Sequence, residues 1–255
     1  MDVFLVDDGS SDGTADAVSA IFPPVRIIRG DGTLFWGGAM RAAWLEAAKG
    51  DYDGYLWLND DTELATDAVS RLCLFQQNKC EDDRPPPIVV GTLVDPDSGG
   101  PTYGGVDRLE RVLDPGTGER ACHTMNGNCV LVPSEVYELI GAISAEFTHN
   151  LGDFDYGLRA KAAGVEIWCA PGYYGFCREN AQSEPWASRD RPLLERWKIL
   201  HSTKGLPPRQ WILYNRRHRR GYWVLALVKL YLRVLFPGPW AALKRSRACR
   251  RNSGS

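Results

Sequence analysis

The chain has 255 residues, of which 44% are hydrophobic and 11% aromatic, and this composition excludes wholesale disorder. Its formal net charge of −2 conceals an asymmetry. Residues 1–195 carry 15 basic and all 32 acidic side chains, a net charge of −17, whereas residues 196–255 carry 15 basic side chains and no acidic one. We therefore predict an acidic domain over residues 1–195 and a basic tail over residues 196–255.

The absence of a secretory signal and the spacing of the cysteines favour a cytoplasmic location. The first residues show no basic segment followed by an apolar one, so no secretory signal is expected. The longest apolar stretch, residues 221–236, contains Lys229 and Arg233 and is shorter than the roughly 20 residues of a spanning helix. The seven cysteines form no Cys-x-x-Cys pair, which favours buried reduced thiols over a disulfide framework or a zinc site.

The first hundred residues alternate apolar runs with helix-like segments. Runs typical of buried strands occupy residues 3–6, 25–28, 55–58 and 88–94. Helix-like segments occupy residues 14–22, 38–49 and 66–77. This alternation predicts an α/β domain with a mostly parallel sheet flanked by helices, in which ligands bind beyond the carboxyl ends of the strands.

The second half loses this alternation. Residues 95–120 are rich in Gly, Pro and Asp, which predicts a hairpin or a long loop. Strands are expected at 129–132 and at 165–169, the latter ended by Pro171 and Gly172. Helices are expected at 134–140, 153–163, 193–201, 208–220 and 221–236.

The first acidic cluster, residues 7–14, follows the first predicted strand. Asp8, Ser10 and Asp12 match the start of a calcium-binding loop, but Ser19 stands where such a loop needs Glu, so this interpretation is disfavoured. Acids that merely cap the following helix are the plainer alternative.

The second cluster, Asn59-Asp60-Asp61, follows the third predicted strand. Oxygen ligands in an Asx-x-Asp pattern at a strand end can hold a hard divalent cation, which can in turn neutralise a leaving diphosphate. A solvated turn is the alternative.

The third cluster opens the predicted helix at 153–163. One of its carboxylates, Asp153 or Asp155, can act as a general base while the other pairs with Arg159. Ordinary acids that complement the helix dipole are the alternative.

In this order, the three clusters resemble the motifs of glycosyltransferase family 2, whose members have the GT-A fold. The resemblance covers about residues 3–180 and rests on the segments 6–14, 58–64 and 152–160. The segment 30–40 also looks like the family's second nucleotide-site loop. The resemblance implies an inverting transfer of a sugar from a nucleotide-diphosphate sugar to an acceptor hydroxyl, with Mg²⁺ or Mn²⁺ as cofactor.

The resemblance also implies roles for individual residues. Asp153 is the general base, supported by Asp155 and Arg159, and Asp61 holds the metal with Asn59. The nucleotide sugar is bound by Asp7, Asp8, Ser10, Asp31, Gly32, Trp36, Gly37, Gly38 and Asp60. Glycines allow the backbone to approach a phosphate, and an aromatic face suits a sugar ring, although core packing is the alternative for Phe35 and Trp36.

Two departures from the family pattern stand out. Gly152 occupies the position where the family usually has Glu before its base. The family normally opens with a strand and helix ahead of the strand that ends at Asp7, so we expect an N-terminally truncated domain with two unpaired strand edges.

The tail joins basic blocks to an apolar, aromatic segment. The blocks 216–220 and 244–251 flank residues 222–236, a pattern typical of a helix that lies in an anionic membrane surface. A helix packed on the catalytic domain is the alternative. A nucleic-acid partner is disfavoured because no nucleic-acid-reading module accompanies the tail.

The sequence therefore predicts a glycosyltransferase that is peripheral on the inner face of a membrane and builds a cell-surface glycan on a glycan or lipid-linked acceptor. The alternative is a non-catalytic protein that binds a sugar nucleotide or a glycan. The presence of Asp61 and Asp153 favours the enzyme, and the missing first strand favours the alternative.

Overall fold

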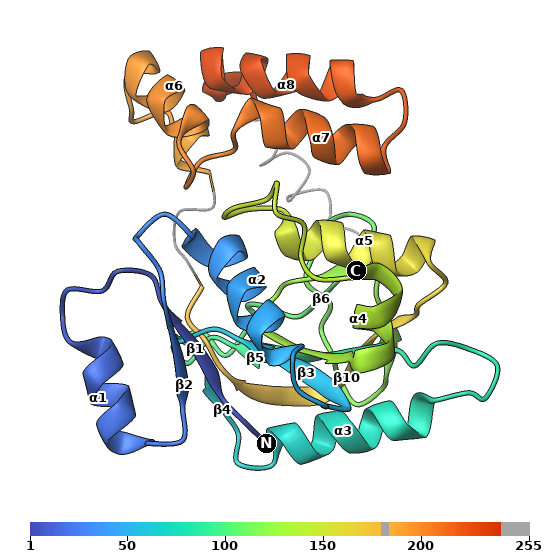
Figure 1. The fold of residues 1–255 in the computed structure, drawn as a ribbon. Helices are drawn as coiled ribbons and strands as arrows, with labels where there is room; N and C mark the ends of the chain where they lie inside the picture. The colour runs from blue at the N-terminus through green and yellow to red at the C-terminus, as the bar shows by residue number, and fades with distance from the viewer. Residues whose placement is uncertain (180–183, 241–255) are drawn as a thin grey trace. The chain divides into compact units, whose positions relative to one another are not determined.

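The chain divides into two compact units, Met1–Glu179 and Asn180–Ser255, and the computed structural model describes residues 1–179 and 184–240 (Figure 1). Sequence analysis drew the boundary at residue 195, where the acidic residues end. The second unit begins earlier because a short 3-10 helix, η1 (Pro185–Ala187), packs against α6 (Leu193–His201) and α8 (Trp223–Leu235). The change in charge therefore falls inside a packed unit.

The first unit alternates strands and helices through its amino-terminal part, as predicted. Its helices are α1 (Thr14–Ile21), α2 (Phe35–Ala47), α3 (Ala68–Lys79), α4 (Ser134–Ile140) and α5 (Gly152–Ala162). Its strands are β1 (Phe4–Asp7), β2 (Arg26–Arg29), β3 (Gly54–Leu58), β4 (Glu63–Leu64), β5 (Ile88–Val94), β6 (Gly105–Val106), β7 (Arg120–Ala121), β8 (Thr124–Met125), β9 (Cys129–Pro133) and β10 (Ile167–Phe176). The predicted α/β class is confirmed.

The predicted mostly parallel pairing is wrong in the main sheet. Six strands pair in the order β3-β9-β5-β10-β4, with β7 on β10, and within the described residues only the β5–β10 pair of this sheet is parallel. The reason is that β9, late in the sequence, lies between β3 and β5 and runs against both. A parallel pair of β1 and β2 forms a separate sheet, and β6 pairs with β8.

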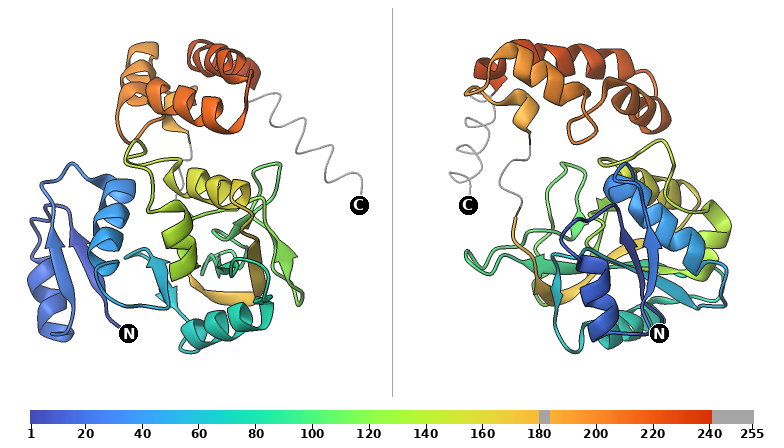
Figure 2. Two further views of the ribbon diagram at one scale, coloured as in Figure 1. Left: turned by 45° about the vertical axis from the view of Figure 1, so that its right-hand side comes forward. Right: turned by 60° about the vertical axis from the view of Figure 1, so that its left-hand side comes forward.

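Strand alternation divides the interior of the first unit into two cores. One core takes Ile88 and Val90 of β5 and packs them against α2, α4 and α5. The other takes Val89 and Leu93 of the same strand and packs them against α3. Because successive side chains of a strand point to opposite faces, helices cover both faces of the sheet, as two further views show (Figure 2).

Two predicted boundaries differ in ways that matter for the site. The strand expected to end at Pro171 continues to Phe176, because shifts of register between Cys169 and Tyr173 let the strand bulge past the proline. The helix expected from Gly38 begins at Phe35, so the predicted loop ends earlier.

The second unit is helical, as predicted. Helices α6, α7 (Pro208–His218) and α8 enclose a small core around Trp186, Leu200, Leu230 and Val234. No helix in residues 1–179 or 184–240 is long and apolar enough to cross a membrane. The predicted basic run 244–251 lies outside the described residues.

Candidate active site

The directions of strands β3, β9 and β10 bring the predicted site residues close together. Because β9 runs against β3, residues just before β9 lie beside residues just after β3, and Leu58 faces Cys129 in the ladder. The carboxyl end of β10 places Cys177 beside Asp61, which follows β3. Sheet topology thus brings together segments that are far apart in the sequence.

The carboxylate of Asp7 is used within its own turn. Its Oδ1 accepts the backbone N–H of Ser10 at 2.9 Å, and Arg29 Nη1 lies 3.4 Å from its Oδ2. Hydrogen bonds from Ser10 hold the pKa of Asp7 below its ordinary value. Asp7 and Ser10 therefore stabilise the turn after β1.

Asp8 fastens the glycine-rich loop to β1. Its Oδ1 accepts the N–H of Gly32 at 2.8 Å and its Oδ2 accepts the N–H of Phe35 at 2.9 Å. Phe35 has a φ of 53°, a left-handed conformation that is uncommon outside glycine. Both carboxylate oxygens of Asp8 thus hold the loop in shape, with Phe35 in a strained conformation at its end.

The first turn of α2 packs against the loop that precedes α5. Gly37 donates its N–H to Thr148 O at 2.7 Å, and a Cβ at Gly37 would lie 2.3 Å from Phe147 O. The chain can approach so closely only without a side chain at this position. Trp36, Gly37 and Gly38 lie in α2 and not in the predicted loop.

Trp36 connects α2 with the end of β3. Its Nε1–H donates to Asn59 Oδ1 at 2.8 Å, and its ring meets Trp57 edge-on with the centroids 6.5 Å apart. Asn59, predicted as a metal ligand, therefore holds Trp36. Asp60 and Asp61, which follow it, are exposed.

A two-residue segment before β9 bridges the strand-end acid and the helix-start acid. Gly127 donates its N–H to Asp153 Oδ2 at 3.1 Å, and Asn128 Nδ2 lies 3.9 Å from Cys177 Sγ. Cys177 Sγ in turn lies 3.6 Å from Asp61 Oδ1. Asp61 and Asp153 are thus ends of one contact network.

Gly127 also sets the distance between the predicted base and the tryptophan. A Cβ at Gly127 would lie 2.3 Å from the Trp36 ring and 3.4 Å from the Asp153 Cβ. One glycine therefore separates an aromatic ring from a carboxylate.

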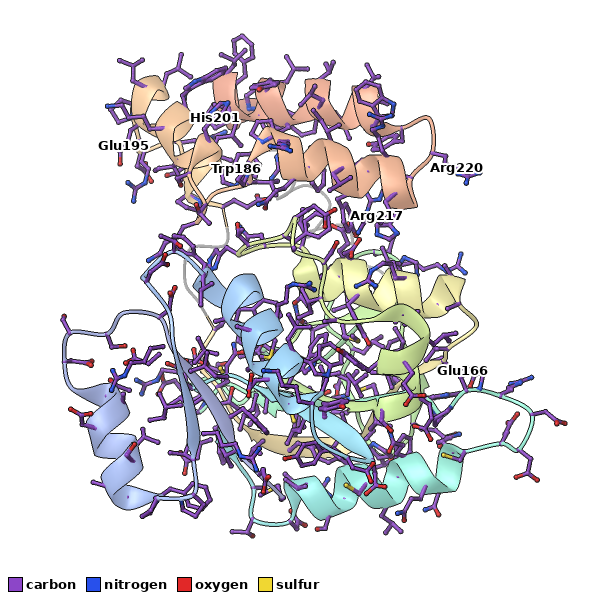
Figure 3. All side chains as sticks on the ribbon, viewed as in Figure 1. Glu166, Trp186, Glu195, His201, Arg217 and Arg220 are labelled. Atoms are coloured by element: carbon purple, nitrogen blue, oxygen red, sulfur yellow. The ribbon has the colours of Figure 1, made fainter. Side chains whose placement is uncertain are left out.

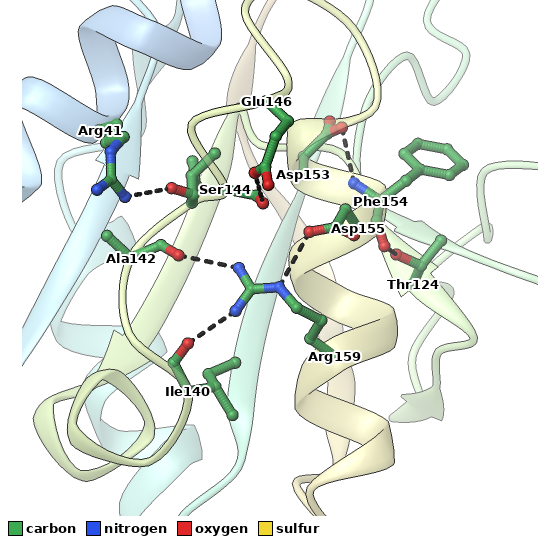
Figure 4. Close-up of polar contacts among 11 residues, drawn as sticks. Arg41, Thr124, Ile140, Ala142, Ser144, Glu146, Asp153, Phe154, Asp155 and Arg159 are labelled. Carbon is green, nitrogen blue, oxygen red and sulfur yellow. Dashed lines mark hydrogen bonds and ion pairs between the residues drawn. The ribbon is translucent and has the colours of Figure 1, made fainter. Parts of the chain in front are cut away.

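Asp153 has the environment of a general base. It sits in the first turn of α5, where its Oδ1 accepts the N–H of Phe154 at 2.8 Å (Figure 4). Burial raises the pKa of Asp153 to about 6, against the opposing effect of the N–H groups of Phe154 and Gly127. A carboxyl group with this pKa can both hold and release a proton near neutral pH.

Two residues along the same helix, Asp155 has the opposite environment. It is fully buried, and its Oδ2 accepts from Arg159 Nε at 2.9 Å. Arg159 also donates to the backbone oxygens of Ile140 and Ala142, at 2.7 and 2.9 Å (Figure 4). The predicted pair thus fixes α5 to the chain after α4.

The structure brings some predicted site residues together and leaves others apart. Trp36, Asn59, Asp61 and Asp153 meet around Gly127 and Asn128. Asp8 and Gly32 join at the loop, where Asp31 Oδ1 accepts the N–H of Thr33. Gly38 donates to Leu34 O, and the exposed Asp60 has no contact with them among those described.

Sequence reasoning missed Gly127, Asn128 and Cys177. The Asn-Gly-Asn run before an apolar segment was a usable signal for a close backbone approach at a strand start. No local signal marked Cys177, because Pro171 and Gly172 suggested that its strand had already ended.

The residues at Asp61 fit a divalent cation only as a partial set of ligands. The carboxylate is exposed, and the Cys177 thiol is its only partner among the described hydrogen bonds. No group of three His, Cys, Asp or Glu residues within residues 1–179 and 184–240 could hold a metal ion by itself. A cation here would need oxygens from a bound diphosphate.

Comparisons with known proteins concern the family pattern and the fold. The sequence model of the family Glycosyl transferase family 2 matches residues 1–115. No curated protein matches the chain.

Two solved structures share the fold. One is GalNAc-T7 with UDP, GalNAc and Mn²⁺, with a TM-score of 0.51 and 14% identity over 85% of this chain and 44% of that one. The other is TarS 1–349 of S. aureus, with a TM-score of 0.50 and 12% identity over 69% of this chain and 51% of that one. The chain thus spans about half the length of each. The resemblance to glycosyltransferase family 2 is therefore confirmed for residues 1–115, and the chain shares the GT-A fold of these two structures.

Proposed function

We propose that the protein is an inverting glycosyltransferase that moves a sugar from a nucleotide-diphosphate sugar to an acceptor hydroxyl. The observation that carries the proposal is the contact network from Asp61 through Cys177, Asn128 and Gly127 to Asp153. It joins an exposed strand-end carboxylate, suited to a cation, with a carboxyl whose pKa is raised to about 6. Transfer from an activated sugar needs both functions at one place.

In this proposal Asp153 accepts the proton of the acceptor hydroxyl. Its raised pKa keeps it a better proton acceptor than an ordinary carboxylate, and it is ionised at pH 7. The N–H groups of Gly127 and Phe154 hold one oxygen each and orient the group. A base on one face of the sugar and a leaving group on the other give inversion.

The donor side rests on the loop that Asp8 organises. The absence of a side chain at Gly32 lets a diphosphate approach the loop closely, although Asp8 takes the N–H group of this residue, and Trp36 offers a ring edge beside Asp153. Asp61, with Asp60 and Asn59 nearby, would hold Mg²⁺ or Mn²⁺. When bound, such a cation stabilises the charge of the departing diphosphate. The UDP and Mn²⁺ in the GalNAc-T7 crystal support this choice.

A donor screen followed by a transfer assay tests the function. Thermal shift is measured against several nucleotide-diphosphate sugars with and without Mn²⁺, and the anomeric configuration of any transferred sugar is read by NMR. A metal-dependent shift and an inverted product are expected. A shift without transfer, unchanged in Asp153→Asn, would favour the non-catalytic sugar-nucleotide-binding protein instead.

We also propose that the second unit binds an anionic lipid surface, so that the acceptor is lipid-linked and serves cell-surface glycan synthesis at the inner face of a membrane. Helix α8 buries Ala226, Leu230 and Val234, yet its other face is also apolar. The exposed side chains there, each at least 40% exposed, are Val224, Leu225, Val228, Leu232, Leu235 and Phe236. Such a contiguous apolar face is uncommon on a protein surface that meets only water.

Charge favours a lipid surface over another apolar partner. The basic block 216–220 includes Arg217 and Arg220, which lie at the end of α7 away from Trp186 and His201 (Figure 3). Basic residues near an anionic surface contribute about 1 kcal/mol each. The second basic block, residues 244–251, would add to this attraction.

Vesicle binding tests the lipid proposal. The full chain should sediment with phosphatidylglycerol vesicles, less with phosphatidylcholine, and Val228→Glu should reduce this binding about tenfold or more. Leu74→Glu, at a side chain 58% exposed on α3, is the matched control and should bind as the wild type does. If Val228→Glu altered the oligomeric state and left vesicle binding intact, the apolar face would bind protein instead.

A further inference from the structure

The second unit buries a cationic side chain that the lipid proposal does not use. Arg196, the fourth residue of α6, is only 8% exposed. Its guanidinium makes one described hydrogen bond, from Nη1 to Ser188 O at 3.3 Å, and its enclosed Nε has no partner among residues 1–179 and 184–240. A guanidinium offers five N–H donors, and a charged side chain is rarely buried unless it is paired.

No described carboxylate neutralises this guanidinium. Residues 184–240 contain three acids. Two of them, Glu184 and Glu195, pair with other arginines, and the third, Asp190, is exposed and makes no ion pair among the described residues. A buried charge without a counter-charge is costly, and a buried polar atom without a partner calls for an explanation such as a missing ion. Arg196 therefore points to an external anion.

The amino end of α6 supplies further donors at the same place. Helical side chains lean towards the amino end of their helix, and the bond to Ser188 places the Arg196 guanidinium beside the segment that leads into α6. Pro192 precedes the helix and caps none of its N–H groups, and the N–H groups of residues 193–195 have no acceptor within the described chain. The positive end of a helix dipole also favours an anion.

Apolar side chains border this place. Leu193 and Leu194, at the start of α6, are both exposed, the latter by 76%. Arg189 donates from Nη2 to Gly238 O, which ties the segment before α6 to the chain that follows α8. Phe236, 59% exposed, lies two residues before that contact. These three apolar side chains form an apolar rim, which suits an anionic group that is attached to an acyl chain.

We propose that Arg196 and the amino end of α6 bind a phosphate group, and that the apolar rim selects the phosphate of a lipid headgroup over the free ion. This inference rests on the proposed lipid binding of the second unit and names a site for the headgroup. The site is separate from the basic block 216–220, because Glu195 and Arg220 lie at opposite ends of the unit (Figure 3). The planar guanidinium matches phosphate oxygens with paired N–H donors.

The test is a calorimetric titration of the full chain with dihexanoyl phosphatidate, a soluble lipid with a phosphomonoester headgroup, and separately with inorganic phosphate. The wild type should bind one phosphatidate per chain, and should bind inorganic phosphate about tenfold more weakly because the free ion leaves the apolar rim uncovered. Arg196→Met keeps an apolar stem, removes the charge, and should weaken phosphatidate binding about tenfold or more. Lys198→Met removes an exposed charge from another face of α6 and should bind as the wild type does.

The melting temperature separates a ligand site from a structural role. Without ligand, Arg196→Met should melt at the wild-type temperature or above it, because the variant no longer buries an unpaired charge. If Arg196→Met fails to fold, Leu194→Glu replaces it, since this exposed position places a negative charge at the site without touching the interior. Leu194→Glu should weaken the binding of both ligands about tenfold, and Leu74→Glu on α3 should not.

The outcomes separate this inference from the proposed function. Binding of neither ligand, or equal binding by the wild type and Arg196→Met, overturns the phosphate site, even where the protein sediments with vesicles. Equal affinity for phosphatidate and inorganic phosphate overturns the selection of a lipid and assigns the site to the free ion. Loss of phosphatidate binding in Arg196→Met supports the site, even where no sugar is transferred.

Discussion

The two strand ends that carry acidic clusters use their carboxylates in opposite ways. At the end of β1, both oxygens of Asp8 accept backbone N–H groups of the loop that leads into α2. At the end of β3, Asp61 remains exposed and contacts only a thiol among the described hydrogen bonds. Similar sequence signals thus mark a carboxylate that shapes the chain and a carboxylate left available.

The difference separates acids that stabilise the fold from acids that can take part in chemistry. An acid whose oxygens are saturated by the protein's own donors adds to stability, whereas one with spare acceptor capacity beside a site can meet a ligand. The same division separates Asp155, paired with Arg159, from Asp153, whose pKa is raised. Substitutions at these acids test whether the division holds.

The largest expected effect is the loss of transfer in Asp153→Asn, by a factor of about 10²–10⁴, because an amide cannot accept the proton. Stability should move the other way. The raised pKa means that the free energy of unfolding falls as pH rises from about 4 to 6, so the amide variant should be up to about 3 kcal/mol more stable at pH 8. Transfer assays and denaturant melts measure both.

The matched control for this variant is Asp82→Asn, which changes an exposed acid in the loop after α3. If Asp153→Asn transferred sugar at the wild-type rate, Asp153 would not be the general base, and its role would not differ from that of Asp155.

Gly127→Ala should have the next largest effect. Its Cβ would lie 2.3 Å from the Trp36 ring, and the overpacking should cost about 1–3 kcal/mol of stability and displace the ring from the base. Thermal melts and the KM for donor measure these effects. Gly118→Ala is the control, since no atom lies within 4 Å of its Cβ, and a similar loss there would refute the packing argument.

Asp8→Asn and Asp61→Asn compare the two strand ends directly. Asp8→Asn turns one acceptor into a donor that faces another N–H, and should destabilise the protein by about 1–2 kcal/mol. Asp61→Asn should change stability by less than about 0.5 kcal/mol while abolishing metal-dependent nucleotide binding. Chemical denaturation and calorimetric titration give both quantities. Equal stability losses would contradict the comparison.

The smallest expected effect is a pH dependence. Because the base must be ionised, kcat/KM should rise through pH 6 and level off above it, with about a tenfold loss at pH 5. The profile is measured at saturating metal over pH 5–8. A midpoint near pH 4 would show that burial does not raise the pKa of Asp153 in solution.

Much of the fold could be predicted from local pattern. The apolar runs of β1, β3, β5 and β9 and the helices α4 and α6 lie within a residue or two of their expected positions. The order of the strands could not be predicted, because the alternation of strands and helices does not indicate that β9 lies between β3 and β5. The direction of pairing depends on long-range packing.

The acids of the candidate site could be predicted from the sequence, but the contacts between them could not. Asp61 and Asp153 follow from strand ends and a helix start, but Gly127 and Cys177 act through positions that only the folded sheet creates. Trp36 was expected to face a ligand from a loop, yet it lies in α2 and donates to Asn59. The residues next to a side chain in the sequence do not indicate which distant residue it will contact in the fold.

The close approach of Gly37 to Thr148 has a consequence for protein engineering. One backbone contact joins the loop on the donor side to the segment that leads into the helix of the predicted base. Grafting a loop of different length between β2 and α2 would therefore move the acceptor side as well. Libraries that aim to change the donor sugar should keep Gly37 fixed and vary residues 147–149 together with the loop. The selectivity for the donor and the selectivity for the acceptor are expected to change together.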